Sequence, residues 1–146
     1  MVAYKVYHLL SPAFDMPIEV KLNAEDRYLR VAGPFFEVVH FRTPLFHPQT
    51  LAVSNVYGVP VFQVAPVAGQ PQRWAIQHEH QTLMQANFVD AASVQSNAGQ
   101  AHDATELYPF AVLPGEQPNA AERQMLCAAF AVCCQHVQLL QEAIMA

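Results

Sequence analysis

A run of ten apolar residues late in this chain constrains its fold more than any other feature. Residues 125–134 read MLCAAFAVCC, with no charged or amide side chain among them. A helix on a domain surface carries an apolar stripe, whereas a helix that is apolar on every side must be surrounded by protein. The run is too short to span a bilayer, which takes about 20 residues. We therefore expect a buried helix and no membrane span.

The sequence around this run indicates where the helix begins and ends. Asn119 is a favourable N-cap residue, and Glu122 follows at the position from which a carboxylate can reach back to the capping N–H. No Gly or Pro interrupts residues 120–143, and apolar residues recur at spacings of three and four near the end. The pattern predicts a helix over 119–144 that starts buried and ends on the surface.

Burial of this helix represents a large part of the stability of a domain. At about 1.5–3 kcal/mol for each large apolar side chain, Met125, Leu126, Phe130 and Val132 contribute on the order of 6–12 kcal/mol. Whole domains are stable by only about 5–15 kcal/mol. We therefore expect the rest of the chain to be organised around this helix.

The preceding residues read as a succession of short strands. Segments rich in β-branched and aromatic residues, several of them alternating, are separated by turn-forming residues. Tyr57-Gly58 is the best hairpin turn, and Pro60 after it predicts an edge or a bulge because proline cannot donate to a sheet ladder. Residues 90–103 are small and polar and are expected to form a surface loop. The predicted strands are 2–10, 18–22, 28–31, 35–41, 50–56, 59–64, 74–80, 82–89 and 107–113.

These elements predict an α+β protein that is mostly β: an antiparallel sheet or barrel-like body packed around one buried C-terminal helix. The length of 146 residues favours a single domain over 1–146, with a β-rich body over 1–113 and the helix over 119–144. The apolar run fits a helix wrapped by its own sheet and a helix buried at a subunit interface equally well.

The surface of such a domain would be poor in charge. Charged residues make up 13% of the chain, against about 25% in ordinary domains, while apolar residues make up 53%. A weakly charged surface favours a protein partner or self-association into a homo-oligomer. The seven Lys and Arg residues are dispersed and the net charge is −5, which argues against nucleic acid as a partner.

The three cysteines all fall in the apolar helix. An odd number, with Cys133 and Cys134 adjacent, does not form a disulfide framework, so we interpret them as buried thiols that pack as small apolar side chains. The first residues contain no uninterrupted apolar segment of the kind found in signal peptides. Together these features predict a cytoplasmic location.

His78 and His80 form the most chemically suggestive pair. Residues two apart on a strand face the same side, so the two imidazoles would be placed to hold a transition metal such as zinc. A further ligand is needed, and none follows at a motif-like spacing; His40, His47 or His102 would have to complete the site through the fold. The other interpretation is a pair of polar residues on a solvated strand face.

The chain lacks the signatures of common enzymes. No serine has the Gly-x-Ser-x-Gly context of hydrolases, no glycine-rich phosphate loop occurs, and no catalytic residue is predicted. We predict a non-enzymatic binding or protein-interaction domain without a cofactor. The alternatives are a metal-binding barrel or metal-dependent enzyme centred on His78 and His80, and a barrel that holds an apolar ligand such as a lipid. Aromatic residues that would either line such a ligand pocket or form core are Phe35, Phe36, Phe41, Phe46 and Trp74.

Two short stretches are similar to elements of a known fold. Residues 122–132 read ERQMLCAAFAV, an acidic opening followed by small and aliphatic residues, and residues 56–64 read VYGVPVFQV, a Gly before an aliphatic-aromatic strand. The first resembles the closing helix of the tubby-like superfamily, which includes tubby, the phospholipid scramblases and the LURP-one-related proteins; the second resembles a strand-turn-strand element of the last group. The resemblance implies a closed antiparallel barrel around a central C-terminal helix. The cationic phosphoinositide pocket of tubby has no counterpart here, and no binding residue is carried over.

Overall fold

The computed structural model describes residues 4–33, 36–79, 81–96 and 107–136. Within them lie nine strands and two helices, and each predicted strand corresponds to one observed strand with boundaries shifted by a few residues. The strands are β1 (Lys5–Leu10), β2 (Ile18–Asn23), β3 (Tyr28–Ala32), β4 (Phe36–Arg42), β5 (Leu51–Ser54), β6 (Pro60–Val67), β7 (Gln70–His78), β8 (Gln81–Phe88) and β9 (Leu107–Val112). The helices are α1 (Ala91–Ser96) and α2 (Ala120–His136).

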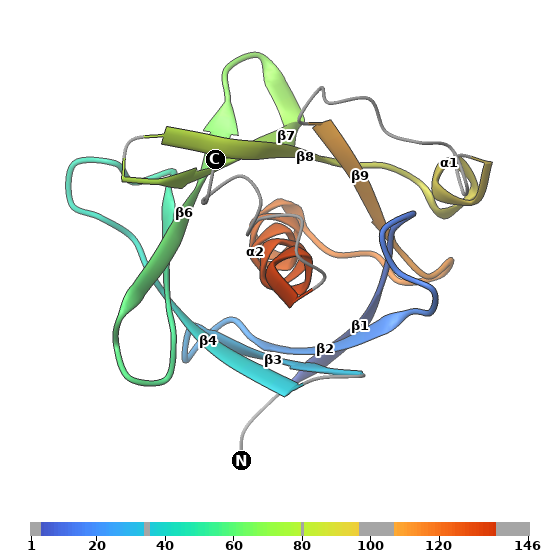
Figure 1. Ribbon diagram of the computed structural model, residues 1–146, viewed down its shortest axis with the longest axis horizontal. Helices are drawn as coiled ribbons and strands as arrows, with labels where there is room; N and C mark the ends of the chain where they lie inside the picture. The colour runs from blue at the N-terminus through green and yellow to red at the C-terminus, as the bar shows by residue number, and fades with distance from the viewer. Residues whose placement is uncertain (1–3, 34–35, 80, 97–106, 137–146) are drawn as a thin grey trace.

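The nine strands close into a barrel in sequence order, with α2 inside the ring (Figure 1). Strands β1 to β8 pair antiparallel with their sequence neighbours, and β9 pairs antiparallel with β1 but parallel with β8. A ring of alternating strand directions closes only when the number of strands is even, so a nine-stranded ring needs a parallel pair. The predicted mostly-β, barrel-like body around one C-terminal helix is confirmed.

The parallel pair explains a helix that the sequence did not predict. Parallel neighbours need a crossover of about a dozen residues or more, usually with a helix in it. Here α1 lies in the connection from β8 to β9, outside the ring (Figure 1). Asp90 caps it: the carboxylate accepts the Ser93 N–H at 2.7 Å, and the carbonyl accepts the Val94 N–H at 3.3 Å. The prediction of a loop over 90–103 is therefore wrong for Ala91–Ser96.

Pro60 sits at an irregularity of the ladder, as its sequence position predicted. The pairing of β5 with β6 shifts after Val53, so that Ser54 lies opposite Pro60. A bulge leaves one residue of a strand without a ladder hydrogen bond, and proline has no N–H to contribute at such a position. The bulge is confirmed, whereas the alternative of an edge strand is not, because β6 pairs on both sides.

Side chains complete the short junction between β1 and β9, where two residue pairs connect the strands. The Ser11 hydroxyl donates to the Pro109 carbonyl at 3.0 Å. The Glu116 carboxylate accepts the backbone N–H of His8, also at 3.0 Å. These contacts satisfy backbone groups that a longer ladder would otherwise pair.

Alternation along the strands gives the barrel an apolar inner face. In β2, Ile18, Val20 and Leu22 are buried, while Glu19 and Lys21 between them are partly exposed. The inward residues of the strands and the residues of α2 belong to one core cluster. The apolar inner face of the sheet is therefore covered by α2.

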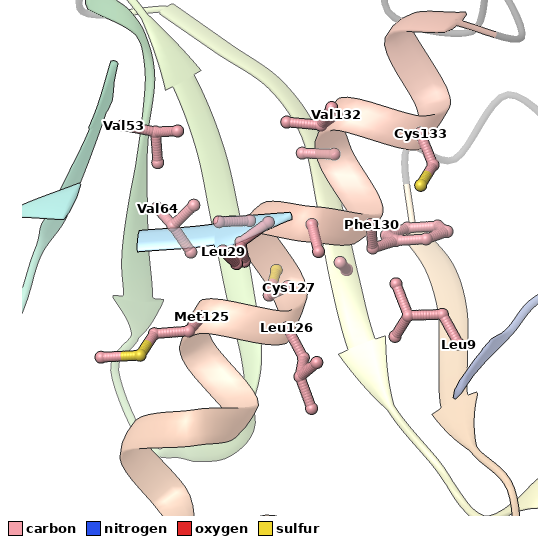
Figure 2. Packing of buried hydrophobic residues seen from close by; sticks show 14 of the residues in the cluster. Leu9, Leu29, Val53, Val64, Met125, Leu126, Cys127, Phe130, Val132 and Cys133 are labelled. Carbon is pink, nitrogen blue, oxygen red and sulfur yellow. The ribbon is translucent and has the colours of Figure 1, made fainter. Parts of the chain in front are cut away.

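Helix α2 fills this interior (Figure 2). Residues 125–134 are all buried, with exposures between 0 and 8%. Wall residues such as Leu9, Val53 and Val64 point towards the helix in Figure 2, and Phe130 stacks on Phe110 of β9 with ring centroids 5.3 Å apart. The helix is therefore wrapped by the sheet of its own chain.

The described part of α2 ends at His136. The remaining positions of the predicted helix, 137–144, lie outside the described residues. Neither of the two helices described is long and apolar enough to cross a membrane.

Candidate functional site

Because α2 occupies the barrel interior, the places open to a ligand or partner are the two ends of the barrel and its outer wall. We call the end where α2 begins the Asn119 end, and the end that its last described residue reaches the His136 end. Strand directions place the turns after β2, β4 and β6 at the Asn119 end. The turns after β1, β3, β5 and β7 lie at the His136 end.

His78 lies on the outer wall, near the end of β7. Its Nδ1 is 3.0 Å from the Val61 carbonyl oxygen, so the tautomer with a proton on Nδ1 donates there and keeps the Nε2 lone pair. Nε2 lies 3.9 Å from the Glu79 carboxylate. A hollow of about 450 Å³ adjoins the ring; its lining includes Arg42, Ser54, Gln63 and Gln77.

The metal site predicted for His78 and His80 is not tested by these positions, because His80 lies outside the described residues. Among the described residues, no three His, Cys, Asp or Glu side chains gather closely enough to hold a metal. His47 belongs to a turn at the opposite end of the barrel from His78, and His102 also lies outside the described residues. The paired histidines therefore remain a prediction.

The three cysteines are buried on α2, as their sequence context predicted. Burial raises the pKa of the Cys133 thiol to about 12 and also raises the pKa of Cys127 and Cys134. The thiolate is the form that attacks electrophiles and binds metals. These thiols, held protonated, act as packing groups.

The Asn119 end is held by the capping box that the sequence predicted. The Asn119 side-chain oxygen accepts the Glu122 N–H at 2.8 Å, and the Glu122 carboxylate accepts the Asn119 N–H at 3.0 Å. The same carboxylate lies 3.1 Å from Nζ of Lys5 in β1. One acidic residue thus closes the first turn of the helix and ties it to the wall.

Glu122 is ionised although its residue is only 3% exposed. Burial raises its pKa, but the Asn119 N–H, Lys5 and Tyr7 together lower it more, so the net pKa lies below the ordinary value. Burial and the neighbouring Glu122 charge raise the pKa of Tyr7 to about 12. A general acid or base works best with a pKa near the ambient pH. The pKa values of Glu122 and Tyr7 are both shifted away from neutral pH, as expected of a structural network.

The turn between β5 and β6, at the His136 end, has a well-defined backbone. The side-chain oxygen of Asn55 accepts the N–H groups of Tyr57 and Val59, at 2.9 and 3.1 Å. The Asn55 carbonyl accepts the Gly58 N–H, and the Val59 carbonyl accepts the Asn55 N–H, both at 3.0 Å. Gly58 has a φ of 77°, which residues with a side chain rarely adopt. We call residues 55–59 the β5–β6 tip.

The β5–β6 tip displays apolar side chains to solvent. Tyr57 is 86% exposed, and Val56 and Val59 are each more than half exposed. Turns usually carry Gly, Pro, Asn, Asp or Ser because these residues suit the backbone. Here Asn55 and Gly58 meet that need and leave the other three positions to apolar residues.

A hollow of about 410 Å³ adjoins the β5–β6 tip where α2 reaches the His136 end. His136 is one of its polar groups, and its Nε2 lies 3.3 Å from the Glu37 carboxylate. The described lining combines three valines with four polar residues: Val39, Val61, Val132, Glu37, Asn55, Gln135 and His136. Asn55 therefore shapes the tip and lines the hollow, so the two form one candidate binding site.

The sequence predicted the turn but not the exposure of its apolar residues. The sequence predicts Val56 and Val59 as strand ends, because β-branched residues favour strands. The expected aromatic core is also corrected in part: Phe41 and Trp74 are buried, whereas Phe36 is 61% and Phe46 89% exposed. Phe35 lies outside the described residues. The signal for this exposed tip is the combination of Asn and Gly with three apolar residues in the five positions 55–59.

Comparisons with known proteins found no match for this chain. No protein-family model matches the chain, and neither a curated protein nor a solved structure matches it.

Proposed function

We propose that this protein is a non-enzymatic binding domain that recognises a protein partner at the His136 end of its barrel. The observation that carries this proposal is Tyr57, an aromatic side chain 86% exposed on a turn that Asn55 fixes with its side chain. Aromatic residues dominate the binding energy of protein interfaces. A fixed backbone also lowers the entropy that is lost when such a residue is buried by a partner.

The hollow beside the tip supplies the polar part of recognition. Protein interfaces combine an apolar anchor with hydrogen bonds around it. Tyr57 with Val56 and Val59 forms the anchor, while Glu37 and Gln135 offer an acceptor and an amide next to it. The partner that suits this arrangement presents an apolar surface flanked by hydrogen-bond donors.

Two other functions remain as alternatives. A transition-metal site at His78 and His80 is supported by the partly exposed strand position of His78 and its contact with the Val61 carbonyl, which orients the ring. An apolar ligand inside the barrel is less favoured, because α2 side chains such as Phe130 already fill the space between the walls.

We also propose a relationship in architecture to the tubby-like superfamily. The support is the combination of residues 122–132 and 56–64 with a closed barrel around a helix that follows the strands. The element built by residues 56–64 is the hairpin that carries the β5–β6 tip.

Site-specific photo-crosslinking tests the proposed function. A benzophenone amino acid is placed at Tyr57, and in a matched variant at Glu79, in the cells that naturally produce the protein. Glu79 also lies in a turn at the His136 end, and its side chain is 85% exposed, but it is polar. We expect a discrete crosslinked species from position 57 and none from position 79.

A crosslink at both positions, or at neither, would contradict a partner site at the tip. A competition step adds a second criterion, because excess wild-type protein should abolish the crosslink and excess Tyr57→Ser protein should not. Turnover of an ester, phosphoester or sugar substrate by the purified protein would overturn the non-enzymatic assignment.

A further inference from the structure

The Asn119 end of the barrel carries a second apolar tip, in the connection from β4 to β5. Two consecutive turns form it: the His47 N–H donates to the Pro44 carbonyl at 3.2 Å, and the Thr50 N–H to the His47 carbonyl at 3.0 Å. Leu45 and Phe46, at the apex of the first turn, are 93% and 89% exposed. These are the most exposed large apolar side chains among the described residues. We call residues 44–47 the β4–β5 tip.

A hollow of about 550 Å³ lies at the same end of the barrel, beside α1, and we call it the α1 hollow. Figure 1 places α1 across the ring from β4 and β6. Two carboxylates, Asp90 and Glu116, belong to the lining, which is otherwise mainly apolar: Phe88, Val89, Ala91, Ala92, Val112 and Leu113. The volume falls within the range of about 300–1,000 Å³ that is usual for occupied pockets.

The tip and the hollow are placed so that, in a pair of copies of the chain, the tip of each copy can fill the hollow of the other. Both features lie at the Asn119 end, on opposite sides of the ring. A two-fold axis that runs perpendicular to the barrel axis at that end, midway between the tip and the hollow, places the tip of each copy over the hollow of the other. A contact of this kind is closed and uses one patch twice, as most homodimers do.

The chemistry of the two features is complementary. The connection over residues 43–50 reads TPLFHPQT and contains no carboxylate, so nothing in it repels Asp90 or Glu116. The Ser93 backbone N–H, followed by its side chain, holds the pKa of Asp90 below its ordinary value, so this carboxylate is charged at neutral pH. The ring of His47, next to Phe46, carries the N–H that such a carboxylate accepts.

A lipid surface suits this end less well. Anionic membranes attract basic clusters beside an apolar anchor. The β2–β3 turn, at the same end, carries Arg27 together with Glu25 and Asp26, and Lys5 is paired with Glu122. The α1 hollow adds two more carboxylates, so the cations of this end do not form a basic cluster. A second copy of this chain offers both an apolar pocket and acceptors for His47.

We propose that the Asn119 end is a homodimer interface in which Leu45 and Phe46 of each copy occupy the α1 hollow of the other. The interface lies at the opposite end of the barrel from the β5–β6 tip. Its failure in a test would therefore leave the proposed partner site untouched.

Sedimentation equilibrium over a concentration series tests the dimer. We expect wild-type protein to dimerise reversibly and Phe46→Ser to raise the dimer dissociation constant at least about tenfold, the effect of losing a central aromatic anchor. Ala92→Trp, which places a large side chain in the α1 hollow itself, should also raise the dimer dissociation constant. Tyr57→Ser is the matched control, because it removes an equally exposed aromatic residue from the opposite end.

Directed disulfide formation tests the contact itself. Phe46→Cys and Ala92→Cys proteins are mixed under mild oxidation, and we expect a heterodimer linked between positions 46 and 92. Position 46 paired with an exposed control, Glu79→Cys, should give no such product. The native thiols do not interfere, since all three are buried.

Three results would overturn the proposal. One is a wild-type protein that stays monomeric at the highest attainable concentration. Another is a dimer that neither Phe46→Ser nor Ala92→Trp weakens, or one that Tyr57→Ser weakens as much as they do. The third is a monomer that binds phosphatidylcholine–phosphatidylserine vesicles through Leu45 and Phe46, which would make lipid the occupant. Circular dichroism of each variant separates loss of association from loss of fold.

Discussion

Glu122 links the start of a buried helix to the wall around it, and its charge makes this link sensitive to pH. We expect Glu122→Gln to lower the free energy of unfolding by about 1 kcal/mol at neutral pH, since a hydrogen-bonded buried charge is lost while the amide oxygen still accepts the Asn119 N–H. Urea unfolding of both proteins measures the difference.

The pH dependence of that difference follows from the sign of the shift. The folded-state pKa of Glu122 lies below the ordinary value of 4.5, so its stabilisation is complete above that value and disappears as the pH falls through the folded-state pKa. Wild type and Glu122→Gln should therefore converge in acid. Glu25→Gln, at an exposed turn, is the control that should match wild type throughout. A constant gap at every pH would show that the Glu122 charge is not the stabilising feature.

A transition-metal site at His78 and His80 would be visible in the metal content of the purified protein. If His78 and His80 hold a transition metal, protein purified without chelators contains metal in a fixed ratio, and His78→Ala/His80→Ala protein contains none. Elemental analysis by mass spectrometry measures both. His8→Ala/His136→Ala is the control, because it removes the same number of imidazoles and neither residue is a candidate ligand of this site. Equal metal content in all three proteins, or none in any, would support solvated polar residues instead.

Helix α2 is the element on which the core depends. We expect Ala129→Asp to prevent soluble folding, because a carboxylate at a position 0% exposed leaves an uncompensated charge, which costs several kcal/mol. Ala121→Asp is the matched control: it lies in the exposed first turn of the same helix, where an acidic residue is favourable. Thermal unfolding and solubility compare the two. A normally folded Ala129→Asp protein would contradict the buried position of the helix.

The elements that the sequence predicted are those with local signals. Asn119 and Glu122 fixed the helix start, and the alternation of Ile18, Val20 and Leu22 fixed a strand, because each pattern lies within a few residues. The parallel pairing of β8 with β9 has no local signal, since it follows from the number of strands in the closed ring. The α1 helix depends on that crossover and was missed with it.

The candidate site was predicted less well than the fold, and for a related reason. Phe41 and Phe46 look alike in sequence, yet one is buried in the core from a paired strand and the other lies at the apex of a turn. Exposure depends on where a turn points once the barrel has closed. Sequence patterns alone therefore predict as core some aromatic residues that lie on the surface. They also do not predict that the apolar residues of the β5–β6 tip are exposed.

The barrel wall and the helix that it encloses come from separate parts of the chain. We expect a chain ending at Pro118 to lose its native structure, because the apolar inner faces of nine strands would enclose no helix. Near-UV circular dichroism reports this through Trp74, which is 4% exposed and packs 6.2 Å from the ring of Phe110. A truncated chain that keeps the sharp native spectrum would show that the wall is stable alone.

The position of α2 after all nine strands has a consequence for synthesis. The ribosome synthesises the wall first, and at about 5–20 residues per second the inner face of the first strand waits on the order of ten seconds for the helix that covers it, whereas that of β9 waits only a few seconds. Closure of the barrel is therefore an event that follows translation of the last turns. During that interval the nascent chain presents apolar strands to whatever chaperone stands at the tunnel exit.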